Sequence, residues 1–285
     1  MHEEYTKSEF AAQTALTDKK NLGIIYVLCV CLSMSNTISK HAIKIENLTK
    51  RFEKVTAVDD LSLEIGWGEL FGLLGPNGAG KTTVINILST LLEPTNGVAA
   101  VADHDVVFGA DEVRKIIGVC PQEPAFYQHL TGRENIELMG DLHEVPKDVL
   151  KDRVETMLKK IGLEDDADRR AGQYSGGMIR RVSTLMALIS DPKVALLDEP
   201  TVAMDPVSRR AVWDFIRELK SNGKSIILTT HYMEEAEELC DRVGIIDQGK
   251  LIALGSPKEL MEEHHAEDLE EVFIKLTGKK LREGF

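Results

Sequence analysis

The chain has 285 residues, of which 43% are hydrophobic, so it is long enough to bury a full core and too apolar to be disordered. Its 34 basic and 47 acidic residues give a net charge of −13, which disfavours a protein whose main partner is nucleic acid. None of its four cysteines forms a Cys-x-x-Cys pair, which argues against a disulfide framework or a zinc site and favours a reducing compartment.

Residues 1–40 contain a short apolar run, Leu22–Met34, which is too short for a bilayer that requires about 20 apolar residues. Its length matches the apolar region of a signal peptide, but no cleavage site follows it. Alternatively, Met34 is the true start of the protein, or the run is a weak membrane-surface anchor. We expect residues 1–40 to lie outside the fold.

From residue 42 onward, predicted strands alternate with predicted amphipathic helices. The expected strands are 42–46, 61–65, 69–74, 116–120, 194–198, 225–229, 243–247 and 250–254, and helices between them include 81–92, 206–219 and 233–240. This alternation predicts an α/β fold with a mostly parallel sheet.

Two regions depart from the alternation. Residues 123–180 show only helical patterns, at 131–143 and 147–161, and predict a helical subdomain inserted into the sheet domain. Thr131 and Glu134 form the pattern of a capping box at the start of the first helix. The tail 256–285 is acidic and helical, and we expect its acids to face solvent while its apolar side chains, Leu269, Val272, Phe273 and Leu276, pack inward.

The strongest local pattern is a glycine-rich segment between a predicted strand and a predicted helix. It consists of Gly75, Pro76, Asn77, Gly78, Ala79, Gly80, Lys81, Thr82 and Thr83 and fits G-x-x-x-x-G-K-[ST]. Glycines let successive backbone N–H groups surround a polyphosphate, and the start of the helix adds positive potential. Lys81 would reach the outer phosphates, and the Thr82 hydroxyl suits Mg²⁺. The segment, hereafter the phosphate loop, predicts a nucleotide site.

Two acids, Asp198 and Glu199, follow a buried strand pattern. Because side chains alternate along a strand, we expect them on different sides of the carboxyl edge of the sheet, where ligands bind in open α/β folds. One acid would hold Mg²⁺ while the other orients and deprotonates water. Strands that end in acids are common, so this interpretation depends on the phosphate loop that precedes them.

Three further patterns, together with the phosphate loop and the two acids, follow one another along the chain in a recognisable order. Gln122 follows the strand at 116–120, Ser175-Gly176-Gly177 opens a helix after the inserted region, and His231 follows the strand at 225–229. With these motifs, residues 42–255 resemble the nucleotide-binding subunit of ABC transporters. The Tyr-Ser-Gly-Gly-Met form at 174–178 and the tail at 268–278 resemble its drug- and antibiotic-export branch. The resemblance implies a P-loop NTPase core with a mostly parallel sheet, an antiparallel β portion and an inserted α-helical subdomain.

The resemblance also implies roles for single residues, with ATP and Mg²⁺ as ligands. Phe52 would stack on adenine, since an aromatic face offers affinity with little base selectivity. Thr82 and Asp198 would hold Mg²⁺, and Gln122 would contact Mg²⁺ or the attacking water and relay the nucleotide state to the inserted helices. Glu199 would act on water, and His231 would bind the γ-phosphate.

The remaining motif residues are expected to act between two copies of the chain. Ser175, Gly176 and Gly177 would contact ATP bound to the phosphate loop of a second subunit, and Asp205 would couple the two sites. Met178 and Met204 stand where this family more often has Gln and Leu, and neither is expected to abolish activity.

The partners implied are a second copy or a related ATPase subunit and a multi-span membrane permease. The permease would be contacted near residues 122–134, which places the chain on the cytoplasmic side of the membrane. The alternatives are a non-transport ABC ATPase, a GTPase or kinase, and a module that holds ATP without hydrolysing it. The sequence has no long coiled coil, which disfavours a non-transport ABC ATPase, and no Asn-Lys-x-Asp motif, which disfavours a GTPase. The presence of both Glu199 and His231 disfavours a module that does not hydrolyse ATP.

Overall fold

The computed structural model of the chain describes residues 41–278. The apolar run at 22–34 and the last seven residues of the tail therefore lie outside the described residues. Within 41–278, no helix has the length and apolar character required to cross a membrane.

A six-stranded sheet forms the centre of the fold, with strand order β10-β9-β3-β8-β7-β6. Its strands are β3 (Leu70–Leu74), β6 (Ile117–Cys120), β7 (Val194–Asp198), β8 (Ser225–Thr230), β9 (Arg242–Asp247) and β10 (Lys250–Gly255). All neighbours are parallel except β9 and β10, which are antiparallel. The prediction of a mostly parallel sheet is confirmed.

Both faces of the central strands β3, β8 and β7 are buried, which explains their continuous apolar runs. Along β7, Leu196 packs into one hydrophobic cluster, whereas Ala195 and Leu197 pack into the other. Ile227 and Leu228 of β8 divide in the same way. Alternation along each strand therefore sends side chains into two separate cores rather than into one core and solvent.

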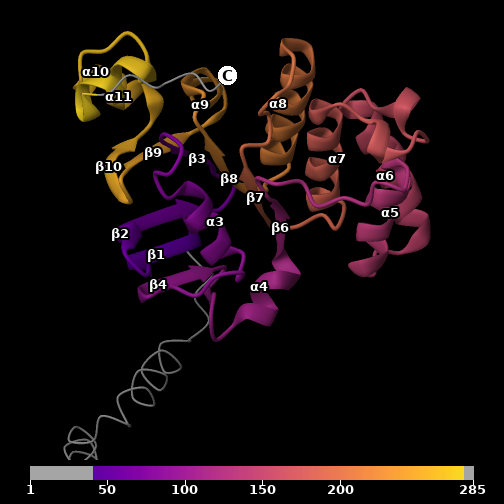
Figure 1. Cartoon of the computed structure of the whole chain (residues 1–285), viewed down its shortest axis with the longest axis horizontal. Coiled ribbons are helices and arrows are strands. Elements are labelled where there is room, and N and C mark those ends of the chain that lie inside the picture. The colour runs from indigo at the N-terminus through magenta and orange to yellow at the C-terminus, as the bar shows by residue number, and fades with distance from the viewer. Residues whose placement is uncertain (1–40, 279–285) are drawn as a thin grey trace, which may run out of the picture. The chain divides into compact units, whose positions relative to one another are not determined.

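A second sheet is antiparallel and has the order β2-β1-β4-β5. Its strands are β1 (His41–Phe52), β2 (Val55–Gly66), β4 (Asn96–Val101) and β5 (His104–Asp105). It shares a hydrophobic cluster with helix α3 (Lys81–Leu88), and Figure 1 shows β1, β2 and β4 beside that helix. This sheet is the antiparallel β portion that the resemblance implies.

Residues 121–193, all described by the structure, contain helices but no strand. The helices are α5 (Gly132–Leu142), α6 (Lys147–Lys160) and α7 (Gly176–Leu188), with short 3-10 turns η2 (Glu164–Asp166) and η3 (Ala171–Gln173). The predicted capping box is present, because Thr131 and Glu134 each accept from the other's backbone N–H. Figure 1 shows α5 and α6 beyond α7 and α8, away from β1 and β2.

The other helices are α4 (Ala110–Ile116), α8 (Pro206–Ser221), α9 (Met233–Leu239), α10 (Pro257–Glu263) and α11 (Leu269–Thr277). As predicted for the tail, Leu269, Val272 and Phe273 are buried, and Leu276 packs against the same cluster. The backbone N–H of Leu269 donates to the Glu237 carboxylate of α9 at 2.5 Å, which ties the tail to the helix after β8.

The predicted helix at 81–92 is too long, because α3 ends at Leu88. Ser89 is its C-terminal cap, and Thr90 takes a left-handed backbone with φ of 64°. A non-glycine residue in this region interrupts the helical hydrogen-bond pattern, so the chain turns before reaching Leu92. The strands β4 and β5 and the helix α4 were not predicted.

Candidate functional site: a nucleotide site at the carboxyl edge of the sheet

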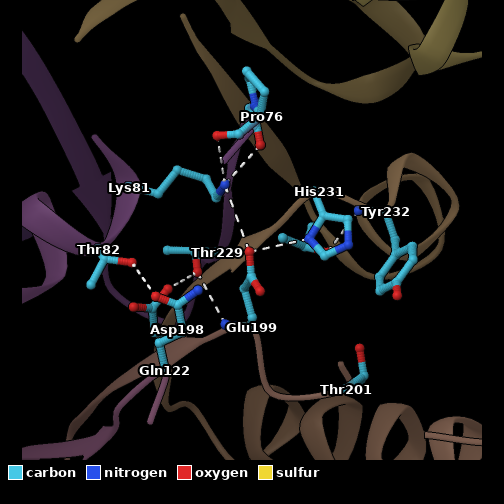
Figure 2. A network of polar contacts seen from close by, with 12 residues as sticks. Pro76, Lys81, Thr82, Gln122, Asp198, Glu199, Thr201, Thr229, His231 and Tyr232 are labelled. Atoms are coloured by element: carbon cyan, nitrogen blue, oxygen red, sulfur yellow. Dashed lines mark hydrogen bonds and ion pairs between the residues drawn. The ribbon is translucent and has the colours of Figure 1, made fainter. Parts of the chain in front are cut away.

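Four adjacent strands, β3, β8, β7 and β6, end in register at one edge of the sheet. Leu74 pairs with Thr230, Asp198 with Thr229, and Cys120 with Leu197. The segments that follow these ends carry the phosphate loop, Gln122, Glu199 and His231, so residues far apart in sequence meet at one place (Figure 2). This is the edge at which open α/β sheets bind ligands.

Glycine is required at two positions of the phosphate loop. Gly75 leaves β3 with φ of 157°, and a Cβ added there would lie 2.2 Å from the carbonyl oxygen of Ile246. Gly80 precedes α3 with φ of 109°, and its Cβ would lie 2.3 Å from the carbonyl oxygen of Ala57. The loop is therefore held against two other segments and turns directly into the start of a helix, where phosphate is favoured.

Lys81 is the cation of the site, and only 5% of its surface is exposed. Its Nζ donates to the carbonyl oxygens of Gly75 and Pro76 at 2.7 and 3.1 Å, and lies 3.8 Å from Glu199 Oε1. Burial lowers the pKa of the Lys81 ammonium from its ordinary value, although the charges of Glu199 and Asp198 oppose this effect. A buried cation that bonds to its own loop's carbonyls is able to exchange those bonds for phosphate oxygens.

Three oxygen-bearing side chains of the predicted magnesium site lie together. The Thr82 hydroxyl donates to Gln122 Oε1 at 3.3 Å, and Arg180 bonds the backbone carbonyls of both Gln122 and Asp198, which holds these two residues near each other. Asp198 Oδ2 is buried and has no hydrogen-bond partner among the described residues, while Oδ1 accepts from Thr229 Oγ1. A buried carboxylate oxygen without a partner beside hydroxyl and amide oxygens is a donor set suited to Mg²⁺.

Glu199 lies one residue beyond β7 and has a left-handed backbone with φ of 51°. The left-handed turn therefore sets the direction of the Glu199 side chain relative to Asp198. Its N–H donates to Thr229 O and Thr229 Oγ1 at 3.1 and 3.0 Å, and its carbonyl accepts from Arg180 Nε at 2.9 Å. Surrounding bonds thus hold a backbone conformation that is sparsely populated outside functional sites.

The Glu199 carboxylate lies between two cationic or donating groups. His231 Nδ1 is 3.1 Å from Oε1, and because an ionised carboxylate only accepts, this nitrogen carries the proton. Burial alone would raise the pKa of Glu199, but the His231 hydrogen bond and the charges of His231, Lys81 and Arg180 outweigh it and lower that pKa. Figure 2 shows Lys81 and His231 approaching the same carboxylate. An ionised, oriented carboxylate can accept a proton from water.

The other predicted site residues lie away from this group. Phe52 ends β1 with 44% of its surface exposed, and the Lys50 ammonium lies 5.1 Å from its ring centroid. Ser175 caps α7 by accepting from Met178 N, and Asp205 caps α8 by accepting from Val207 N and Ser208 N.

No hydrogen bond or ion pair among residues 41–278 joins Ser175, Gly176, Gly177 or Asp205 to the phosphate loop. A Cβ on Gly177 would instead lie 3.4 Å from the carbonyl oxygen of Ala203, so the Ser-Gly-Gly segment adjoins the segment that precedes Asp205.

Sequence reasoning missed two buried residues near the site. Arg180 donates to four backbone carbonyls at the ends of β6 and β7. Glu235 of α9 accepts from Thr201 Oγ1 at 2.6 Å and Trp213 Nε1 at 2.8 Å. Both use ionisable side chains in the interior, where such groups are rare. Their only sequence signal is a charge within an otherwise apolar helix face.

Comparisons with known proteins agree with this geometry. The model of the ABC transporter family matches residues 58–202. A daunorubicin resistance ATP-binding protein of Streptomyces coeruleorubidus is 43% identical over 78% of this chain and 70% of its own length. ABC transporter A family member 5 of Arabidopsis thaliana is 46% identical over 80% of this chain, which spans only 25% of that longer protein.

Among solved structures, one similar protein is an ATP-binding cassette that was determined as a dimer in a post-hydrolysis state with ADP and Pi. It has a TM-score of 0.70 and 27% sequence identity, and the match covers 75% of this chain and 98% of that chain. The P-loop NTPase architecture expected from the sequence is therefore confirmed at the level of the fold.

Proposed function

The chain belongs to the ABC transporter family as an ATP-binding and ATP-hydrolysing subunit, and from this premise we propose that it powers a separate membrane permease that exports drugs or other small molecules. The observation that supports the ATPase step most directly is the Glu199 carboxylate, held in an ionised state between His231 and Lys81. The name of the Streptomyces relative supports the export of a drug.

ATP would bind with its phosphates in the phosphate loop. Lys81 would transfer its hydrogen bonds from the carbonyls of Gly75 and Pro76 to the outer phosphates. The backbone of residues 75–83 would surround the phosphates at the start of α3. The partly exposed Phe52 ring would stack on the base, which adds affinity with little selectivity among bases.

Magnesium would bind to Thr82, Gln122 and Asp198, where it would neutralise charge on the β- and γ-phosphates. The buried Asp198 Oδ2, which has no partner among residues 41–278, supports this assignment. No three His, Cys, Asp or Glu side chains within the described residues form a cluster of metal ligands, so this mixed oxygen set is the one we propose.

Hydrolysis would proceed by attack of water on the γ-phosphorus. Glu199 would accept a proton from that water, a new P–O bond would form, and the bond from the γ-phosphorus to the bridging oxygen would break. ADP takes the electron pair of the broken bond, and inorganic phosphate leaves. His231 would orient Glu199 through Nδ1 and contact the γ-phosphate.

A complete site would need two copies of the chain. Ser175 and Gly176 are exposed at the start of α7 and have no hydrogen bond to the phosphate loop of their own chain within the described residues. We propose that they contact ATP held by the partner, with Asp205 between the sites. The dimeric neighbour with ADP and Pi supports this arrangement.

The membrane partner would contact the helical region near residues 122–134 and hold the chain at the cytoplasmic face of the membrane. Gln122 begins this region and also bonds Thr82, so nucleotide binding and permease contact would meet at one segment. The transported molecule would touch the permease rather than this chain.

Replacing Glu199 with Gln tests the proposal. The amide is nearly isosteric but cannot accept the water proton, so ATP hydrolysis should slow by about 10²–10⁴-fold while ATP binding persists. In saturating ATP the variant should elute as a dimer in size-exclusion chromatography. Glu234→Gln is a matched control, since Glu234 is exposed on α9.

Full hydrolysis by Glu199→Gln would contradict the assignment of the proton acceptor. A protein that stays monomeric in saturating ATP would contradict the two-copy site. The Glu234→Gln control should keep the hydrolysis rate of the unaltered chain.

A further inference from the structure

Arg180 is a fully buried arginine in the second turn of α7, with 2% of its surface exposed. It follows the Ser175 cap by five positions on the same helix. It pairs with no carboxylate in the described ion pairs, so its charge is compensated in another way.

Backbone carbonyls provide that compensation. Nη1 donates to Pro121 O at 2.6 Å and Gln122 O at 2.8 Å, Nε donates to Glu199 O at 2.9 Å, and Nη2 donates to Asp198 O. A planar guanidinium with rigid donors fixes the spacing of the acceptors it joins. One side chain thus holds the backbone at the ends of both β6 and β7.

These four carbonyls belong to, or directly adjoin, residues that the proposed hydrolysis uses. Gln122, Asp198 and Glu199 are themselves three of the bonded positions. A shift or rotation of α7 would therefore move the backbone that carries the magnesium ligands and the proton acceptor. The left-handed turn at Glu199 is especially exposed to such a shift, since its carbonyl is one of the bonded groups.

We propose that Arg180 is a positioning residue that couples the Ser175–Gly177 segment at the start of α7 to Gln122, Asp198 and Glu199 at the ends of β6 and β7. The proposal rests on the two-copy site: when Ser175–Gly177 meets the partner's nucleotide, Arg180 passes the position of α7 to the hydrolytic groups of its own chain. Occupancy of one ATP site thereby sets the geometry of the other.

The next residue, Arg181, is a matched control. It lies on the same helix and also donates to carbonyls, namely Ile161 O at 2.8 Å and Gly162 O at 3.0 Å. Those carbonyls belong to the loop after α6 rather than to the ends of β6 and β7. Arg181→Lys therefore alters two hydrogen bonds of the same kind on the same helix without touching the proposed coupling.

The test compares Arg180→Lys, Arg180→Gln and Arg181→Lys in the full chain. Lysine keeps the charge but cannot bridge both strand ends, so Arg180→Lys should lower kcat at least about tenfold and change the KM for ATP by less than about threefold. Arg180→Gln should lower kcat further, and Arg181→Lys should leave both constants within about threefold. Thermal unfolding followed by circular dichroism confirms that each variant is folded.

A double-mutant cycle with Ser175→Ala tests the coupling itself. If Arg180 relays the state of Ser175, Arg180→Lys should cost at most about threefold in kcat once Ser175 is already Ala, whereas the effects of Arg181→Lys and Ser175→Ala should multiply. Multiplicative effects for Arg180, equal losses at Arg180 and Arg181, or unfolding of both Arg180 variants would overturn the proposal. Dimer formation by Glu199→Gln in ATP tests the two-copy site separately, because Arg180 is unchanged in that variant.

Discussion

Glu199 shows how much of this site depends on backbone conformation at a single residue. Glu199 takes a left-handed backbone directly after β7. Its N–H donates to Thr229, and its carbonyl accepts from Arg180. The carboxylate is then directed toward His231 and Lys81 instead of continuing the strand alternation. Its lowered pKa keeps it ionised at every pH above the ordinary carboxyl range, as a proton acceptor requires.

Glu235 provides a second prediction at the scale of one residue. Burial raises the pKa of this carboxyl. Hydrogen bonds from Thr201, Thr230 and Trp213 and the charge of Arg209 lower the pKa, but by less, so the net direction is upward. The folded chain therefore retains a proton that the unfolded chain releases above about pH 4.3, so the free energy of unfolding should fall as pH rises from there through the raised pKa.

Glu235→Gln removes that titration and keeps an acceptor for Thr201 and Trp213. The free energy of unfolding of Glu235→Gln, measured by urea denaturation, should not fall as pH rises in this way. It should exceed the free energy of unfolding of the unaltered chain near pH 8, and the two values should converge near about pH 4. Parallel curves over this range would show that Glu235 does not titrate as described. Glu235→Ala serves as a contrast, since it leaves two buried donors without an acceptor and should destabilise by about 2–4 kcal/mol.

Sequence patterns could indicate those candidate site residues that belong to a short motif after the end of a strand, namely Lys81, Thr82, Asp198, Glu199 and His231. Arg180 and Glu235 could not be predicted, because their partners are backbone carbonyls or distant side chains, and such contacts leave no spacing to recognise. The direction of Glu199 was also not predictable, since it depends on the φ angle of one residue.

At the scale of elements, the contact between α7 and β6 is very close. A Cβ added to Gly118 of β6 would lie 2.0 Å from the carbonyl oxygen of Ala187 and 2.7 Å from Pro192 Cγ. Helix α7 rests directly on this strand, and the same helix carries Ser175 at its start and Arg180 in its second turn.

Gly118→Ala should therefore displace α7 and lower the free energy of unfolding by about 1–3 kcal/mol, because neither atom can move without its backbone. The midpoint of urea unfolding measures the effect. Gly176→Ala on the same helix meets nothing within 4 Å and should leave stability unchanged or slightly raised. An unchanged midpoint for Gly118→Ala would mean that α7 is not fixed by this contact.

Sequence patterns predicted the buried strands and the longer amphipathic helices, because two apolar faces or a helical period mark them clearly. They missed β4, whose exposed first residues, Asn96 and Gly97, resemble a turn, and the two-residue strand β5. They also extended α3 to Leu92, although Leu91 is 72% exposed and Thr90 has already left the helical conformation. Element ends of this kind are decided by single backbone angles rather than by periodicity.

At the scale of the whole molecule, the phosphate loop and the Ser-Gly-Gly segment lie on different elements with no hydrogen bond between them in the described chain. In two copies related by a twofold axis, the phosphate loop of each copy would face the Ser-Gly-Gly segment of the other copy, which produces two equivalent composite sites. Nucleotide would then join the copies, and its hydrolysis would let them separate, which is how one subunit could drive movement in a permease.

Mixing two inactive variants tests this central claim most directly. Lys81→Ala removes the phosphate cation, and Gly177→Asp places a negative charge where the partner's phosphates would lie, at a helix start that tolerates Asp. Each variant alone should hydrolyse almost no ATP. Their equimolar mixture should recover activity well above that of either variant, up to about a quarter of the unaltered rate, because half of the randomly formed dimers contain one intact site of two and coupling between the sites lowers the rate of that site. A mixture as inactive as its separate components would contradict a site shared between two copies.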